Sequence, residues 1–171
     1  MSERAFVGIG SNLGDRASMI DQAIRALDRS PAIAVVQCSS LWETDPVGPP
    51  QPKYLNGAVE LATTLNPHAL LDALLEIERS LGRSRTENER NAPRTIDLDI
   101  LLFGERVVSE FHLEIPHPRL ALRPFALVPL IEIDASLIYP QGGDLLLSLL
   151  SVAGGNDGVV MWRARKPSSV T

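Results

Sequence analysis

The stretch Glu87–Gly104 reads ENERNAPRTIDLDILLFG, and its character changes at Arg94. Before Arg94 the stretch is polar, and Pro93 blocks a continuing helix. From Thr95 onward apolar residues recur at every second position, which predicts a strand. One face of this strand is expected to hold Ile96, Leu98, Ile100 and Leu102, and the other face Asp97, Asp99, Leu101 and Phe103.

The two aspartates of this predicted strand are a candidate metal site. Carboxylates two residues apart on a strand lie roughly 7 Å apart along one face, which suits one divalent cation or a pair. Aspartate is uncommon in strands, so two in one strand need a reason. The alternative is an exposed edge strand whose acids oppose aggregation. Arg94 favours the metal site, because a metal-bound polyphosphate needs cations beside the metal ligands.

The overall composition is typical of one soluble globular domain. The chain has 171 residues, and 44% of them are hydrophobic, enough for a sizeable core. No apolar run reaches the length of a membrane span, and the first residues lack the apolar segment of a signal peptide. Cys38 is the single cysteine, so an intrachain disulfide is impossible, which fits a cytoplasmic location.

The charge distribution favours a small anionic ligand over a nucleic acid. The net charge of −5 argues against broad binding to a polyanionic polymer. Most of the basic residues are arginines, with one group between Arg79 and Arg94 and a second formed by Arg119 and Arg123. Local arginine groups on an acidic protein fit a small polyanion. The alternative is that these arginines are solvated loop charges.

Periodicity and turn residues predict an α+β fold. Gly8 and Gly10 permit close approach of another group to the first strand. They do not complete the G-x-G-x-x-G pattern of dinucleotide-binding folds, because Leu13 stands at the third glycine position. The order strand–helix–strand–strand–helix–strand predicts a ferredoxin-like βαββαβ core, an antiparallel sheet with both helices on one face. The expected strands cover 5–11, 32–43, 54–64 and 95–103, and the expected helices cover 16–29 and 67–81.

Additional C-terminal elements are expected after this core, within a single domain over 1–171. A hairpin turn at Gly104-Glu105 is expected to return the chain through Val107-Val108. Helices are expected over 125–133 and 144–150. The composition after residue 151 predicts a loose tail, with an edge strand over 159–162.

Two segments outside the predicted elements are candidates for ligand contacts. Residues 44–53 contain four prolines and a glycine, which excludes regular structure and indicates either a functional loop or a surface crossover. His117 lies between two prolines and is followed by Arg119 and Arg123. It is either a ligand-binding histidine or an ordinary structural one.

Five motifs in order carry a resemblance to a known family: GIGSNLGDR, TDPVGPPQPKYLN, IERSLGR, APRTIDLDILLFG and IPHPRLALRPFALVPL. Over about residues 5–140 they resemble the 6-hydroxymethyl-7,8-dihydropterin pyrophosphokinases of folate biosynthesis. The fold of that family is a ferredoxin-like α+β core, which agrees with the predicted element order. The resemblance implies transfer of pyrophosphate from ATP to the hydroxymethyl group of a reduced pterin, with release of AMP.

The resemblance also implies residue roles, with ATP and a reduced pterin as small-molecule partners. We also expect a monomer that binds neither membrane nor nucleic acid. Asp97 and Asp99 are expected to hold two Mg²⁺ ions that bridge the ATP phosphates and the attacking hydroxyl, and Arg83 and Arg94 to complete the catalytic group. Tyr54 and Phe125 are expected to sandwich the pterin, Asn56 to bind its edge, and Thr44, Val47 and Gly48 to read the remaining edge. Nucleotide contacts are expected from Arg85, Ile100, His117, Arg119 and Arg123.

The chain departs from the family pattern at three positions. Asn91 stands where some members have tryptophan, Asp45 where proline is common, and Arg119 where some have tyrosine. These departures bear on loop dynamics and ATP affinity more than on the reaction. Two alternatives are a non-catalytic sensor of a metal–nucleotide or pterin, and a phosphotransferase for another aromatic alcohol. An acidic pair, phosphate-facing arginines and an aromatic–amide pocket together favour the pyrophosphokinase.

Overall fold

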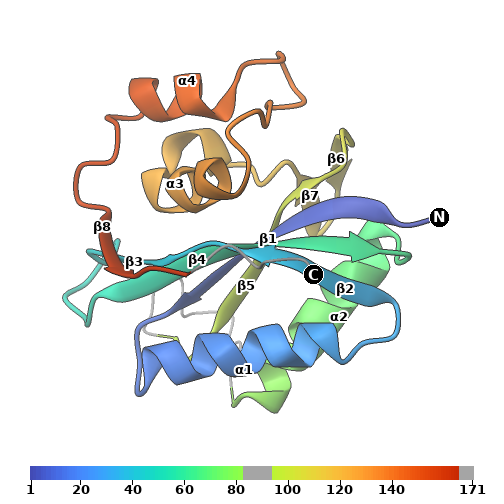
Figure 1. Ribbon diagram of the computed structural model, residues 1–171, viewed down its shortest axis with the longest axis horizontal. Coiled ribbons are helices and arrows are strands. Elements are labelled where there is room, and N and C mark those ends of the chain that lie inside the picture. Colours follow the sequence, from blue (N-terminus) through green and yellow to red (C-terminus); the bar gives the residue numbers. More distant parts are fainter. Residues whose placement is uncertain (83–93, 166–171) are drawn as a thin grey trace.

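A six-stranded antiparallel sheet forms the centre of the molecule, with helices on both faces (Figure 1). The computed structural model describes residues 1–82 and 94–165. The strands follow the order β5-β1-β4-β3-β8, and β2 also pairs with β4. The bounds are β1 Glu3–Ser11, β2 Ile33–Cys38, β3 Leu41–Thr44, β4 Tyr54–Thr63, β5 Asp97–Phe103 and β8 Val160–Arg163.

The helices α1 (Arg16–Asp28) and α2 (Pro67–Ser80) cover one face of the sheet, as the sequence predicts. The side chain of Asp15 accepts a hydrogen bond from the amide of Ser18 and so caps α1, and Asn66 caps α2 in the same way. Their apolar stripes pack on the sheet in one buried cluster. Its members include Ile20, Leu27, Leu70, Leu74, Leu98 and Ile100.

The opposite face of the sheet carries α3 (Pro124–Ile133) and, beyond it, α4 (Leu146–Val152) (Figure 1). A second buried cluster lies on this face and contains Leu127 and Leu130 of α3 and Leu146 of α4. A 3₁₀ turn, Leu120–Leu122, precedes α3. The second cluster covers only part of this face, and the candidate site lies beside it.

Strand β5 alternates as predicted only as far as Ile100. Phe6 of β1 pairs with Leu102 and Val7 pairs with Ile100, so Leu101 is an extra residue in β5. This bulge reverses the phase of the strand. As a result, Leu102 packs in the cluster beside α3 and Phe103 packs in the cluster beside α1 and α2. The predicted faces of these two residues were therefore wrong.

Two other strand predictions need correction, one for the strand over 32–43 and one for the hairpin after Gly104. The predicted strand 32–43 is two strands, β2 and β3, interrupted at Ser39 and Ser40. The amide of Ser39 still donates to the carbonyl oxygen of Ala58 at 2.9 Å, but the amide of Ala58 donates to the Ser39 hydroxyl, at 2.8 Å, in place of a backbone carbonyl. The chain does not return along β5 after Gly104. Instead β6 (Val108–Glu110) pairs with β7 (Leu113–Ile115) in a separate two-stranded sheet, and the side chain of Arg106 binds the carboxylate of Glu3.

The C-terminal elements agree with the sequence analysis where the structure describes them. Helix α3 matches the expected helix, and α4 begins two residues after the expected one. The predicted edge strand is confirmed as β8, which pairs with β3. The predicted looseness of the tail remains a prediction. Within 1–82 and 94–165, no helix is long and apolar enough to cross a membrane.

Candidate active site

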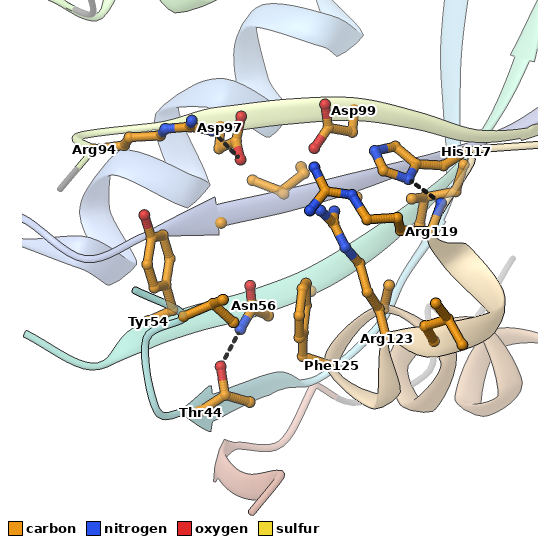
Figure 2. A pocket seen from close by; sticks show the side chains of 18 of the residues that line it. Thr44, Tyr54, Asn56, Arg94, Asp97, Asp99, His117, Arg119, Arg123 and Phe125 are labelled. Atoms are coloured by element: carbon orange, nitrogen blue, oxygen red, sulfur yellow. Dashed lines mark hydrogen bonds and ion pairs between the residues drawn. The ribbon is translucent and has the colours of Figure 1, made fainter. Parts of the chain in front are cut away.

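A cavity of about 450 Å³ opens on the sheet face that carries α3 (Figure 2). Strands β1, β4 and β5 form its floor. The end of β3 with the following Pro-rich loop forms one wall, and the segment from His117 to the start of α3 forms another. Its lining residues are Gly8, Ile9, Gly10, Thr44, Asp45, Val47, Tyr54, Asn56, Gly57, Arg94, Asp97, Asp99, Leu101, His117, Arg119, Leu122, Arg123, Phe125 and Ala126.

The acidic pair lies on the cavity side of β5. Asp97 and Asp99 both line the cavity, while Leu98 between them is buried against the helices on the other face. The Nη1 atom of Arg94 donates a hydrogen bond to Oδ2 of Asp97 at 3.0 Å. Both side chains are only partly exposed. Arg94 therefore orients Asp97 and places a cation beside the acidic pair.

Three cationic or hydrogen-bonding side chains face this pair across the cavity: His117, Arg119 and Arg123 (Figure 2). The backbone amide of His117 donates to the carbonyl oxygen of the bulged residue Leu101 at 3.1 Å, which attaches this segment to β5. Burial, together with Arg123 and Arg119, lowers the pKa of His117 to about 4. The imidazole is therefore neutral at pH 7.

The hydrogen bonding of His117 determines which ring nitrogen carries the proton. Its Nδ1 accepts a hydrogen bond from the amide of Arg119 at 3.2 Å. In the neutral ring Nε2 then carries the proton and is a donor. Burial and the charge of Arg119 lower the pKa of Arg123, which remains a guanidinium cation at neutral pH. This side of the cavity offers donors and positive charge, as a polyphosphate requires.

An aromatic–amide slot occupies the other end of the cavity. Tyr54 and Phe125 stand on either side of Asn56 in Figure 2. The Nδ2 atom of Asn56 donates to the hydroxyl of Thr44 at 2.7 Å, and both side chains are buried. This bond turns Oδ1 of Asn56 away from Thr44 (Figure 2). The slot can stack a flat heterocycle on its faces and bind a polar edge.

The floor of the cavity depends on glycines in β1. A Cβ atom at Gly10 would lie 3.1 Å from Oδ1 of Asn56, and one at Gly8 would lie 3.2 Å from Cδ1 of Leu101. The sequence predicted that Gly8 and Gly10 permit close approach of another group to the first strand, but it did not place these glycines in the site. The other lining residues it missed are Ile9, Gly57, Leu101, Leu122 and Ala126, which carry no distinctive chemical signal.

Not every predicted site residue lies in the cavity. Gly48 is exposed with φ of 102° and is not among the lining residues. The side chain of Ile100 is buried among the core residues on the opposite face of the sheet. Arg83, Arg85 and Asn91 lie outside the described residues. Asp45, the departure from the family pattern, is exposed and lines the cavity.

Comparison with known proteins identifies the family. A family model described as 7,8-dihydro-6-hydroxymethylpterin-pyrophosphokinase matches residues 6–135. The chain belongs to this pyrophosphokinase family. The resemblance drawn from the sequence motifs is thereby confirmed, and the matched residues include every described residue that lines the cavity.

Individual pyrophosphokinase relatives cover most of the chain. The 2-amino-4-hydroxy-6-hydroxymethyldihydropteridine pyrophosphokinase of Bacillus subtilis is 46% identical over 134 residues, 78% of this chain and 79% of the relative. The protein of the same name from Pseudomonas aeruginosa is 42% identical over 146 residues, 85% and 89% of the two chains. A crystal structure of wild-type Plasmodium falciparum HPPK-DHPS is similar with a TM-score of 0.68 at 14% identity. The match covers 89% of this chain and 45% of that one, and it shows the fold alone.

The acidic pair of this pyrophosphokinase fits magnesium bound together with a nucleotide. Mg²⁺ is commonly held by one or two carboxylates, with phosphate oxygens and water completing its octahedron. Asp97 and Asp99 supply two carboxylates on one face of the cavity. No group of three or more His, Cys, Asp or Glu side chains able to hold a metal occurs in the part of the chain that the structure describes.

Proposed function

We propose that the cavity transfers the β,γ-diphosphate of ATP to the hydroxymethyl group of 6-hydroxymethyl-7,8-dihydropterin, as a step of folate biosynthesis. The observation that carries the proposal is the juxtaposition in one cavity of an acidic pair, a cationic wall and an aromatic–amide slot. The relatives named above supply the substrate class. In this reaction the pterin oxygen bonds to the β-phosphorus, the bond to the α,β-bridging oxygen breaks, and AMP leaves with that oxygen while the hydroxyl proton is released.

The pterin is proposed to lie between Tyr54 and Phe125. Stacking on both faces and burial of the ring supply affinity, and Oδ1 of Asn56 accepts a hydrogen bond from a pterin N–H group. Because Thr44 already binds Nδ2 of Asn56, the amide is oriented before the ligand arrives. Val47 and the backbone near Gly48 are proposed to meet the remaining edge. A fixed slot of this kind reduces the ordering cost of binding.

ATP is proposed to lie between the acidic pair and the cationic wall. His117 donates from Nε2 to a phosphate oxygen, and Arg119 and Arg123 neutralise phosphate charge. Asp97 and Asp99 would hold the two expected Mg²⁺ ions, which would neutralise phosphate charge and lower the pKa of the attacking hydroxyl. The remaining members of the proposed set are Arg94, which holds Asp97 in place, Arg83 and Arg85. Ile100 would contact the nucleotide through its backbone, because its side chain lies on the opposite face of the sheet.

The proposal also covers the fold type, the oligomeric state, the excluded partners and the location of the enzyme. The antiparallel order β5-β1-β4 with β2 and β3 beyond it supports a ferredoxin-like core, with α1 and α2 on one face. The chain is proposed to act as a monomer. The net negative charge disfavours nucleic acid as a partner. The free thiol of Cys38 fits the reducing cytoplasm.

The nucleotide product tests the proposed reaction. The protein is incubated with ATP, Mg²⁺ and the pterin, and the nucleotides are separated by chromatography. AMP formed only in the presence of the pterin supports diphosphate transfer, and omission of Mg²⁺ should abolish it. ADP in place of AMP would indicate transfer of a single phosphoryl group. Binding of both substrates without turnover would favour the sensor alternative.

A further inference from the structure

Asn12 lies at the end of β1, in the motif GSNLGDR, and joins the two halves of the proposed site. Its backbone amide donates to the carbonyl oxygen of Arg94 at 3.1 Å, and its Oδ1 accepts from the amide of Arg94 at 2.8 Å. Its Nδ2 donates to Oε1 of Gln51 at 2.9 Å and to the carbonyl oxygen of Pro52 at 3.0 Å. One side chain thus binds the segment before β5 and the end of the Pro-rich loop.

Among the described residues, the side chain of Asn12 is buried and hydrogen-bonded through both its nitrogen and its oxygen. The residue is 1% exposed, and the bonds above use both protons of its amide and its oxygen. A buried polar group that loses a partner has a large desolvation cost. Asn12 therefore cannot follow a displacement of one segment without breaking its bonds to the other.

Each segment held by Asn12 leads directly to ligand-binding side chains. On one side, the Arg94 guanidinium binds Asp97 of the acidic pair. On the other side, Gln51 and Pro52 precede Tyr54, whose ring forms one side of the slot. Arg16 of the same motif also holds this loop, because its Nη1 donates to the carbonyl oxygen of Lys53 at 2.9 Å. This hydrogen bond does not involve Arg94.

We propose that Asn12 is a positioning residue that couples the binding of nucleotide and pterin, by transmitting the placement of Arg94 to the Pro-rich loop. This inference rests on the proposed function. Binding of Mg-ATP at the acidic pair fixes the segment at Arg94, and Asn12 then fixes the loop end and Tyr54 for the pterin. The nucleotide therefore raises the affinity for the pterin, and by linkage the pterin raises the affinity for the nucleotide to the same extent.

Asn12→Asp separates this coupling from simple loss of structure. One carboxylate oxygen still accepts from the Arg94 amide, whereas the other faces two acceptors, Oε1 of Gln51 and the carbonyl oxygen of Pro52. The variant thus keeps the nucleotide end of the link and loses the loop end. Arg16→Gln is the matched control. It releases the loop at Lys53 and also removes the ion pair of Arg16 with Glu43 of β3, but it leaves the Asn12 link intact.

The coupling is measured as the ratio of the pterin Kd without and with Mg²⁺ and α,β-methylene-ATP, which cannot be cleaved at the reacting bond. We expect a wild-type ratio above about fivefold, a ratio near one in Asn12→Asp, and a nucleotide Kd in that variant within about threefold of wild type. Arg16→Gln should weaken pterin binding with and without nucleotide alike and keep the wild-type ratio. Circular dichroism and Tm verify folding. If Asn12→Asp does not fold, Gln51→Ala, which removes one loop partner, should also lower the ratio.

Three outcomes would overturn the inference. A folded Asn12→Asp, or failing that a folded Gln51→Ala, that keeps the wild-type ratio would overturn it and leave the proposed function intact. A wild-type ratio of one, with both ligands bound, would do the same. Failure of the wild-type protein to bind the pterin in either condition would overturn the proposed function together with the inference.

Discussion

Replacement of Gly10 by alanine tests the aromatic–amide slot most selectively. The new Cβ would lie 3.1 Å from Oδ1 of Asn56 and 3.6 Å from Cδ1 of Tyr54. The first distance is shorter than ordinary contact, and Asn56 can retreat only by straining its 2.7 Å bond to Thr44. Gly10 is not among the glycines with positive φ, so alanine is compatible with its backbone. Strand propensity favours alanine by about 0.5–1 kcal/mol, which offsets the crowding, and folding should persist.

The expected effect of Gly10→Ala is on pterin affinity. Displacing Oδ1 leaves a pterin N–H group without its partner, which costs about 1–3 kcal/mol, or about 5- to 140-fold in Kd. The pterin Kd is measured by titration calorimetry with Mg²⁺ and α,β-methylene-ATP. Gly8→Ala is the control on the same strand face, because the atoms nearest to its Cβ belong to the Leu101 side chain, the first at 3.2 Å. Its pterin Kd should stay within about threefold of wild type. Wild-type affinity in a folded Gly10→Ala, or an equal loss in both variants, would refute the assignment of Asn56 to the pterin.

Three further predictions concern the other parts of the site. Asp97→Asn should abolish AMP formation. Its free energy of unfolding should change by about 1 kcal/mol or less, because the ion pair of Asp97 with Arg94 is partly exposed. Full turnover by the variant would exclude Asp97 from the metal site. Phe125→Ala should weaken pterin binding by about 1–3 kcal/mol through lost stacking and burial, with ATP affinity kept, and calorimetry with each ligand checks this. The pKa of His117 is about 4 in the folded protein against 6.5 in a model peptide, so unfolding takes up a proton between these values and stability falls as the pH falls through this window. The Tm of His117→Gln should therefore fall less than that of wild type between pH 7 and pH 4.5, and equal falls would contradict a neutral, partly buried imidazole.

The fold was largely predictable from local pattern. Alternation identified β5, and the expected helices 16–29 and 67–81 agree with α1 and α2 on one face of the sheet. The bulge at Leu101 was not predictable, because it results from the register with β1 rather than from a turn signal in β5 itself. The separation of β2 from β3 likewise depends on the contact of Ser39 with Ala58 in another strand.

The candidate site was predictable where chemistry is visible in the residue type. The aspartate pair and the His117 segment stood out by residue type, whereas Tyr54 and Phe125 were assigned only through the resemblance to the family. The structure brings all of them into one cavity. Asn12 was not predictable, because its partners lie 39, 40 and 82 residues away and its role arises from burial. Ile100 shows how a family motif can mislead. Its role was carried over from the motif, whereas its side chain faces the core and does not line the cavity.

The fate of the β-phosphorus of ATP tests the central claim most directly. ATP labelled at that atom is incubated with the protein, Mg²⁺ and 6-hydroxymethyl-7,8-dihydropterin, and the labelled products are separated and weighed by mass spectrometry. Diphosphate transfer predicts that the label leaves the nucleotide entirely and appears in a pterin heavier by two phosphoryl groups, with unlabelled AMP as the other product. Label retained in ADP, beside a pterin heavier by one phosphoryl group, would contradict the account.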